Sequence, residues 1–436
     1  MKRTHTGKLL LVVAVFAMIA AACGGGSTAT PDACTSDPFG CVEIKAGSPI
    51  VVGTLLVISG PNAALGQDSQ NGVVLAADYL DGTFDGKSGT IDGHTISFDH
   101  QDDGCSAEGG QGGAQALASN PDVVGVIGTS CSSAAQGVAD KILSDKGIVL
   151  ISPSNTGPAL TSPAQHQPFY LRTAHNDKLQ GAAVADFAYN ELGARTAATI
   201  HDGSPYADGL QQVFADTFTQ LGGTITDQEA IQVGETDFTS VLTSIGTSTP
   251  DVLYYPIFAA EGALITQQAR QTSGLENATL IGSDGMTSTD FLNAAGSAAD
   301  GMYLSGPDLT AFGGDQSFYQ NQFLPAYRSE FGADPAAVFH AHAYDATNML
   351  FAAIKEVAID SKGDPAGEND STIFIPRTAL KDALFATTNF PGITGNLTCN
   401  ADGDCQTTAT IAMVQVENGQ MTAPVWSKQM TLSSSL

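Results

Sequence analysis

The sequence predicts an α/β protein, because short apolar segments of strand character alternate with segments of helical period along most of the chain. Segments such as VVGVI (123–127) and GIVLI (147–151) contain no alternating polar residue, which is typical of parallel strands covered by helices on both faces. The alternation runs twice, over about 49–171 and again over about 176–302. Each half is long enough for its own core, so we expect two similar lobes, each with a doubly wound parallel sheet.

The first half contains seven elements in strict alternation. In the first helix, Val73, Ala76, Ala77 and Leu80 share one face, and Gly147 ends the last helix. We expect strands over 50–59, 94–100, 122–128 and 147–153, and helices over 69–80, 112–119 and 132–147.

The second half repeats the pattern, and the chain becomes irregular after Met302. We expect helices over 183–193, 208–223, 238–246 and 261–274, and strands over 196–202, 224–232, 251–258 and 278–284. Beyond them we expect helices over 335–357 and 377–388, a solvated insertion at 361–371, and a β-rich end over 408–426.

The first 22 residues have the pattern of an export signal, since Lys2, Arg3 and Lys8 precede the apolar segment 9–22. Its fourteen residues are too few to span a bilayer, which takes about 20. Three alanines before Cys23 resemble a bacterial lipoprotein signal, in which that cysteine is lipidated, although this family usually carries leucine where Ala20 stands. An ordinary secretory signal cut after the alanines is the alternative. Residues 23–48, rich in Gly, Ser, Thr, Pro and Asp, are expected to be a flexible tether.

The chain is strongly acidic, with 17 basic and 45 acidic residues and a formal net charge of -28. This charge argues against nucleic acid or an anionic membrane surface as a partner. The simplest explanation of the charge is that it keeps the protein soluble.

Six cysteines remain after Cys23, an even number that favours disulfides in an exported chain. Their positions favour local pairs, although six cysteines allow 15 pairings. A zinc site is disfavoured because there is no C-x2-C pair and the histidines are scattered, so we expect no metal and no cofactor. The preferred pairs are Cys34 with Cys41, Cys105 with Cys131, and Cys399 with Cys405.

Enzyme motifs are mostly absent, since the chain has neither G-x-S-x-G nor H-E-x-x-H. GTFDGKS (82–88) is one residue too short for a phosphate loop and predicts a turn, and NADGDC (400–405) predicts a hairpin rather than a calcium site. An exported hydrolase using Cys131 or Ser132 with His175 or His201 stays an alternative, but no triad spacing supports it.

Four polar clusters follow predicted strands, where open α/β sheets bind ligands. Ser132 either caps the helix that follows it or holds a carboxylate. Asp284 either forms a turn or binds an ammonium group. The clusters are SGPNAALG (59–66), GTSCSSAA (128–135), SPSNTGP (152–158) and GSDG (282–285).

These clusters belong to a longer series of blocks, including DDGCSAEGG, VVGVIGTSCSSAA, GIVLISPSNTGPALT, HDGSPYADGLQ, DVLYYPIFAAEGALITQQAR and LIGSDG. In this order they resemble the periplasmic branched-chain amino-acid binding proteins of ABC transporters, from about Pro49 to Trp426. The resemblance implies a type I clamshell, in which three crossovers form a hinge and the lobes close on a ligand.

The resemblance also implies roles for residues. Ser132, Asn155 and Thr156 would hold the ligand carboxylate, Asp284 would take its ammonium, and Tyr206 would line the cleft. Cys105 and Cys131 match the cysteine pair that is bridged in this family.

The chain departs from the family's pattern at three positions that contact the ligand in the family, so we also expect Leu65 and Phe258 to line the site. Leu65 stands where the family often has tryptophan, Phe258 where it has tyrosine, and Asp284 where it usually has glutamate. The resemblance therefore supports recognition of the backbone groups of an amino-acid ligand better than it supports a preference for a particular ligand side chain.

Together these observations predict a monomeric, lipid-anchored solute-binding protein outside the cytoplasm, with no enzymatic activity of its own. It would capture an amino acid or related zwitterion and deliver it to an ABC permease and ATPase. A ligand sensor acting on a partner receptor is the alternative, and kinase rather than permease genes beside its own would favour it. We expect the first lobe over 49–173 and 304–391, and the second over 174–303 and 392–433.

Overall fold

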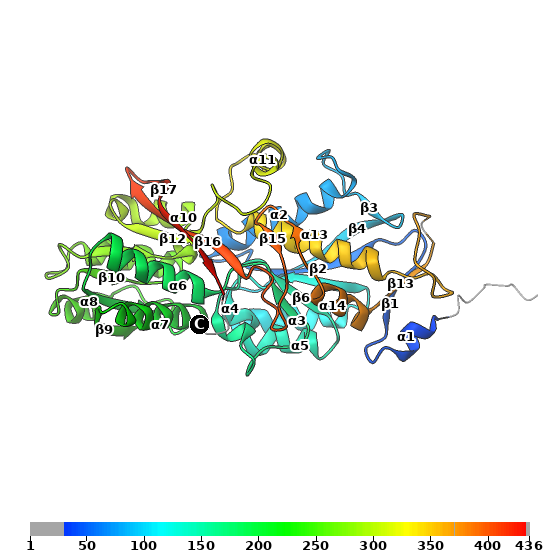
Figure 1. The fold of residues 1–436 in the computed structure, drawn as a ribbon, viewed down its shortest axis with the longest axis horizontal. Helices are drawn as coiled ribbons and strands as arrows, with labels where there is room; N and C mark the ends of the chain where they lie inside the picture. The colour runs from blue at the N-terminus through cyan, green and yellow to red at the C-terminus, as the bar shows by residue number, and fades with distance from the viewer. Residues whose placement is uncertain (1–29, 370, 433–436) are drawn as a thin grey trace, which may run out of the picture.

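The computed structural model describes residues 30–369 and 371–432, which form two lobes joined side by side (Figure 1). Each lobe contains a central sheet with helices on both faces, so the α/β class with two lobes is confirmed. The predicted signal peptide, 1–22, and the predicted lipidation site, Cys23, lie outside the described residues. Within the described ranges, no helix has both the length and the apolarity to cross a bilayer.

The first lobe is built on a sheet of order β3-β4-β2-β5-β6-β7, parallel except for β3. Its strands are β2 (Ile50–Leu56), β3 (Thr90–Ile91), β4 (His94–Asp102), β5 (Val123–Gly128), β6 (Val149–Ser152) and β7 (Tyr170–Arg172). Its helices in this part of the chain are α2 (Ala63–Asp78), η1 (Tyr79–Asp81), α3 (Ala107–Ser119), α4 (Ser132–Ala134), η2 (Ala135–Ala139), α5 (Asp140–Ser144) and η3 (Pro158–Thr161). Val126 and Leu150 pack on the face that α3 covers, whereas Ile127 and Ile151 pack on the opposite face.

The second lobe has a sheet of order β17-β16-β12-β11-β10-β8-β9, in which β16 and β17 are antiparallel additions to five parallel strands. Its strands are β8 (Thr196–His201), β9 (Thr224–Ala230), β10 (Val252–Tyr254), β11 (Thr279–Gly282), β12 (Tyr303–Pro307), β16 (Thr408–Glu417) and β17 (Gln420–Thr431). Its helices are α6 (Asp177–Asp186), η4 (Phe187–Glu191), α7 (Pro205–Gln220), α8 (Thr239–Gly246), α9 (Ala259–Ala269), η5 (Asp284–Met286), α10 (Thr289–Ala295) and η6 (Gly296–Ala299). The predicted β-rich end is the hairpin of β16 and β17.

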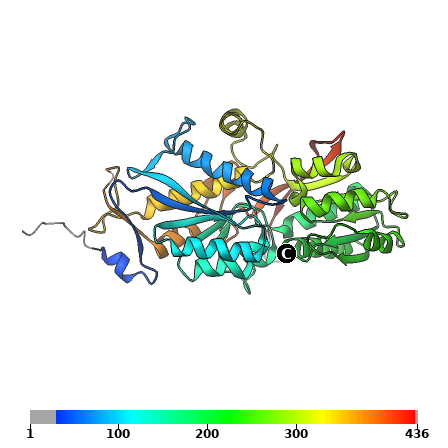
Figure 2. The same ribbon diagram turned by 180° about the vertical axis from the view of Figure 1, so that it is seen from behind.

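After β12 the chain returns to the first lobe and covers one face of its sheet. Figure 2 shows α13 (yellow) beside α2 (blue) on that face. The two helices touch closely at Gly72, where a Cβ atom would lie 2.1 Å from the carbonyl oxygen of His340. The returning elements are α11 (Gln316–Phe318), η7 (Tyr319–Phe323), α12 (Leu324–Phe331), α13 (His340–Val357), β13 (Ile373–Pro376), α14 (Arg377–Phe385), β14 (Phe390–Pro391) and β15 (Asn396–Leu397).

The chain passes between the lobes three times, after β7, after β12 and after β15. Two predicted boundaries need correction. Residues 304–307 belong to β12 and therefore to the sheet of the second lobe. Residues 392–405 belong to the first lobe, because Ile393, Leu397 and Cys405 are buried in its core.

Three predicted helices differ from the observed ones. Helix α2 begins at Ala63 rather than near residue 69. The sequence pattern missed its first turns because they carry no apolar period and bury the polar Asp68. The predicted helix 132–147 is broken at Gly137, whose positive φ of 68° is incompatible with a helix. The predicted helix 335–357 begins only at His340, after an irregular segment.

The predicted tether, 23–48, is wrong over residues 32–44. Helix α1 (Asp32–Ser36) and strand β1 (Cys41–Ile44) are ordered there, and β1 pairs antiparallel with β13. Val42 and Ile44 are buried, and the Cys34–Cys41 disulfide joins the two elements. The composition did not predict this, because the pairing strand lies more than 300 positions away in the sequence.

Replacing Cys34 and Cys41 by serine is expected to lower the free energy of unfolding by about 2 kcal/mol, because the disulfide closes a loop with a sequence separation of 7. Urea unfolding of the variant and the wild type measures this difference. A segment that contributed nothing to the folded lobe would give no difference.

Candidate ligand-binding site

The loops at the carboxyl ends of strands from both sheets meet between the lobes and enclose a small cavity, of about 10 Å³. This volume holds about one water molecule, so the lobes are closed upon each other. First-lobe groups come from loops after β5 and β6 and from the starts of α2 and α13, and second-lobe groups come from α7, α9 and η5. The lining residues are Leu65, Ser130, Cys131, Ser132, Ser154, Tyr206, Phe258, Asp284, Gly285 and Phe339.

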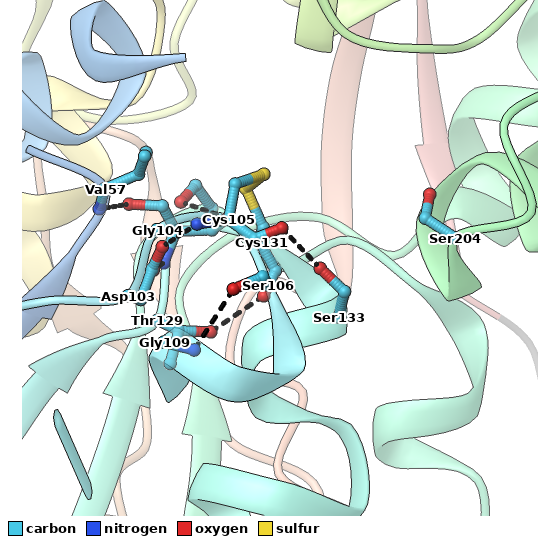
Figure 3. Close-up of a disulfide and its surroundings, with 12 residues drawn as sticks. Val57, Asp103, Gly104, Cys105, Ser106, Gly109, Thr129, Cys131, Ser133 and Ser204 are labelled. Carbon is cyan, nitrogen blue, oxygen red and sulfur yellow. Dashed lines mark hydrogen bonds between the residues drawn. A yellow bond between two sulfur atoms is a disulfide. The ribbon is translucent and has the colours of Figure 1, made fainter. Parts of the chain in front are cut away.

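The Cys105–Cys131 disulfide fixes the first-lobe side of this cavity, and Figure 3 shows it joining the loop after β4 to the loop after β5. The buried carboxylate of Asp103 accepts hydrogen bonds from the backbone N–H of Ser130 at 2.6 Å and of Cys105 at 2.7 Å. Burial raises the pKa of Asp103 to about 7, and these two donors oppose that rise. The predicted bridge is confirmed, as are the other two disulfides, so Cys131 has no free thiol.

Ser132 does not cap the following helix. The N-cap position of α4 is Cys131, and Ser132 is the first helical residue. Its Oγ accepts a hydrogen bond from the N–H of Gly157 at 3.2 Å and lines the cavity. The structure thereby ties the loop after β5 to the loop after β6.

The structure does not bring the Asn155 side chain to the cavity, contrary to our expectation. Its amide bonds instead to Thr129 and to the hydroxyl of Tyr170, all buried within the first lobe. Thr156 is also fully buried, and its hydroxyl lies beside the carboxylate of Asp177. Both residues shape the loop after β6 instead of lining the cavity.

Arg172 holds this loop in place, a role that sequence reasoning missed. Its guanidinium is fully buried and donates to the carbonyl oxygens of Asn155 at 3.1 Å and Gly157 at 2.9 Å. It also donates to Thr161 and forms an ion pair with Asp404 at 2.6 Å. The sequence gives no signal for the pair, because its members are 232 positions apart.

Asp284 is the acidic group on the second-lobe side. Its Oδ1 accepts hydrogen bonds from Gln180 at 2.7 Å and from the hydroxyl of Tyr206 at 2.9 Å, and Tyr206 also bonds to Ser283 at 2.7 Å. Burial raises the pKa of Asp284, while the hydrogen bonds from Gln180 and Tyr206 lower it. A carboxylate in this setting can accept from a cationic group that enters the cavity.

A second buried carboxylate, Asp177, lies near Asp284 and was not predicted. Burial raises the pKa of Asp177 well above its usual range, and the negative charge of Asp284 raises it further. Because Asp284 has two donors that stabilise its charged form, we expect Asp284 to ionise before Asp177. Asp177 begins α6 directly after the first crossover, a position that the strand-end argument did not cover.

Apolar side chains form the rest of the cavity wall. Leu65 and Phe258 line it as expected, and the ring centroid of Phe258 lies 5.2 Å from that of Tyr206. Phe339 joins them from the start of α13, and was missed because the sequence predicted it inside a helix.

The hydrolase alternative finds no catalytic arrangement among the described residues. Ser132 bonds to a backbone amide, while His175 bonds to Gln180 at 2.5 Å. His201 bonds to the N–H of Gly203 at 3.3 Å in the second lobe. Neither histidine is hydrogen-bonded to the hydroxyl of Ser132, as a general base would be.

Residues 49–420 match the family described as periplasmic binding protein. The chain belongs to this family. Membership confirms the resemblance and places the chain among extracytoplasmic solute-binding proteins.

Individual relatives agree with this assignment. The Leu/Ile/Val-binding protein BraC3 of Rhizobium johnstonii is 27% identical over 87% of this chain and 94% of its own. A leucine-, isoleucine-, valine-, threonine-, and alanine-binding protein of Pseudomonas aeruginosa is 27% identical over 80% of this chain and 84% of its own.

Solved structures share the type I fold. The substrate-binding protein LivJ of Streptococcus pneumoniae, in complex with isoleucine, aligns with a TM-score of 0.72 at 26% identity, covering 88% of this periplasmic binding protein and 100% of LivJ. The leucine binding protein LivK of Thermotoga maritima aligns with a TM-score of 0.74 at 23% identity, covering 89% of this chain and 100% of LivK. At this identity the similarity shows a shared fold alone.

Proposed function

We propose that this protein captures a free amino acid by closing its two lobes around the ligand. The observation that carries the proposal is the pairing of Ser132 on one lobe with Asp284 on the other across a single cavity. A zwitterion has a carboxylate and an ammonium group, and these two sides offer complementary partners.

The first lobe supplies the carboxylate side. The Ser132 hydroxyl and backbone N–H groups of the loops after β5 and β6 are the donors we assign to it. Both loops are fixed before the ligand arrives, by the Cys105–Cys131 disulfide and by Arg172. Such preorganisation lowers the ordering cost of binding.

The second lobe supplies the ammonium side. Gln180 and Tyr206 both donate to Oδ1 of Asp284, so Oδ2 is the oxygen we assign to the ligand. Each charge-assisted hydrogen bond contributes roughly 1.5 to 3 kcal/mol, and a few of them support micromolar affinity.

The apolar wall favours an aliphatic or aromatic side chain on the ligand. Leu65, Phe258 and Phe339 surround the space between the two polar sides. The relatives named for leucine, isoleucine and valine agree with this chemistry. A cavity of about 10 Å³ is too small for any amino acid, so the ligand enters when the lobes open and remains inside as they close.

The protein would act as a monomer, without catalysis of its own, and would deliver its ligand to an ABC permease driven by ATPase subunits. Its export signal would be residues 1–22, and a lipid on Cys23 would hold it at the outer face of the cytoplasmic membrane.

Calorimetric titration with the common amino acids tests the proposal. We expect leucine, isoleucine or valine to bind with micromolar affinity and a negative heat-capacity change from apolar burial. If no amino acid bound, the proposal that the ligand is a zwitterion would be wrong, and the site would bind another small solute.

Amino-acid affinity is expected to weaken as the pH falls, because Asp284 must be ionised to accept from the ammonium. Burial raises the pKa of Asp284, so binding is retained above the raised pKa and lost as the pH falls through it. The decline therefore begins at a higher pH than for an ordinary aspartate, whose pKa is about 3.9. Leucine titrations from about pH 8 to about pH 4 measure this, and an Asp284→Asn variant should show weak binding with little pH dependence.

A further inference from the structure

A second cavity lies between the lobes, on the side of the second crossover, and the proposed amino-acid site does not use it. Its volume is about 320 Å³, within the range of small-molecule sites. We call it the crossover pocket. Residues that characterise it are Leu304, Pro307, Leu309, Tyr319, Val338 and Val414.

Both lobes build the crossover pocket. Strands β12, β16 and β17 of the second lobe form one wall, and η7, α12 and the segment 334–338 of the first lobe form the other. A backbone hydrogen bond between the lobes, from Thr289 N–H to the carbonyl oxygen of Ala336 at 3.2 Å, lies at its edge. The volume of the pocket therefore depends on how far the lobes are closed.

One wall of the crossover pocket carries a buried polar relay. The Tyr319 hydroxyl bonds to Nε2 of His340 at 2.7 Å, and Nδ1 of His340 bonds to Asp68 at 2.9 Å. Asp68 also accepts from the backbone N–H of His340 at 3.1 Å and from the hydroxyl of Tyr327 at 3.0 Å. Tyr319 is 3% exposed and His340 and Asp68 at most 1%, so only a compact molecule reaches this wall.

The relay sets the polarity that the pocket offers. A carboxylate only accepts, so Nδ1 of His340 carries a proton, and in the neutral ring Nε2 is then an acceptor. In this tautomer the Tyr319 hydroxyl donates a hydrogen bond to Nε2, which leaves the lone pairs of its oxygen for a donor in the pocket. Burial raises the pKa of Tyr319, so its hydroxyl stays protonated.

We propose that the crossover pocket is a second ligand site, which binds a small neutral molecule with an apolar body and one hydroxyl donor, such as a phenol or an alcohol. The hydroxyl donates to Tyr319 Oη, and the apolar body packs between Leu304 and Val414 on one side and Val338 on the other. A protein surface is too flat to reach the buried hydroxyl.

A ligand in the crossover pocket favours the closed arrangement, because it contacts both lobes. The two sites share the segment 338–339, in which Val338 lines the crossover pocket and Phe339 lines the amino-acid cavity. By thermodynamic linkage, each ligand then tightens the binding of the other by the same factor. This coupling, unlike the pocket itself, rests on the proposed amino-acid function.

Phenol titrated into the methyl-labelled full chain, with no amino acid added, tests the site by NMR. We expect the methyl signals of Leu304 and Val414 to shift with saturation, and toluene, which lacks the hydroxyl, to bind about tenfold more weakly. Absence of saturable shifts at these methyls, or equal affinity for toluene, would overturn the proposal.

Two variants and a matched control locate the contact. Tyr319→Phe should weaken phenol binding about tenfold, and Ala412→Leu, which fills the pocket, should abolish it. Tyr327→Phe removes the hydroxyl that donates to Asp68, and Tyr327 does not line the pocket, so this variant should bind phenol as the wild type does. Wild-type affinity in the Tyr319→Phe or Ala412→Leu variant would contradict the assignment.

Adding leucine to the same titration tests the coupling. Phenol affinity should rise with leucine if both sites work as proposed. Phenol binding without any leucine effect would leave the crossover pocket intact and contradict the linkage alone, whereas failure of every common amino acid to bind would contradict the amino-acid function.

Discussion

Replacing Asp404 by alanine is expected to lower the free energy of unfolding by about 3 to 5 kcal/mol. The substitution leaves the guanidinium of Arg172 fully buried without its charge partner, whose Oδ1 lies 2.6 Å from Nε. Removing one member of a buried ion pair costs far more than the pair contributes when intact, because the remaining charge has lost its hydration. Urea unfolding measured on the variant and the wild type gives the difference.

Two comparisons make this result specific. Asp145→Ala removes an exposed ion pair with Lys141 at 2.8 Å and should leave stability nearly unchanged. Removing both buried charges together, as Arg172→Met with Asp404→Leu, should recover part of the stability lost in Asp404→Ala. A loss no larger for Asp404→Ala than for Asp145→Ala would contradict the role we give the pair.

Replacing Asp284 by alanine is expected to weaken amino-acid binding about 100-fold. The ligand ammonium loses its carboxylate, while Gln180 and Tyr206 lose the acceptor that orders them. The carboxylate side of the ligand and the apolar wall remain, so residual binding should persist at high ligand concentration. Calorimetric titration with leucine measures the change.

Asp290→Ala provides the matched control, because Asp290 is an exposed acid in the cleft beside Asp284. It should bind leucine as the wild type does. Asp284→Glu keeps the charge and should retain most of the affinity. Wild-type affinity in Asp284→Ala would rule out an ammonium contact at this position.

The sequence predicted what depends on local pattern. Central strands such as β5 and β6 were found because burial on both faces leaves no polar residue in them. Ser132 and Asp284 were singled out because they follow strands at the edge where parallel sheets bind ligands, and the resemblance added Leu65, Tyr206 and Phe258; all five line one cavity. Their roles toward a ligand stay predictions.

The sequence could not predict contacts between distant segments. Arg172 and Asp404 meet only because two crossovers run side by side, and β1 is a strand only because β13 pairs with it. Asn155 was assigned to the ligand from the resemblance, yet its amide is used to hold Thr129 and Tyr170. Phe339 was hidden in a helical pattern that begins one residue later.

The docking of the N-terminal segment has a mechanical consequence. Helix α1 lies at the end of the first lobe that faces away from the second lobe (Figure 1), and β1 is joined to β13 of the same lobe. A force applied to the chain at residue 30 is borne by these hydrogen bonds and by the Cys34–Cys41 bond, all within the first lobe. Tension on the N-terminus is therefore taken up within the first lobe, and the closure that we propose for the second lobe would not have to work against that load.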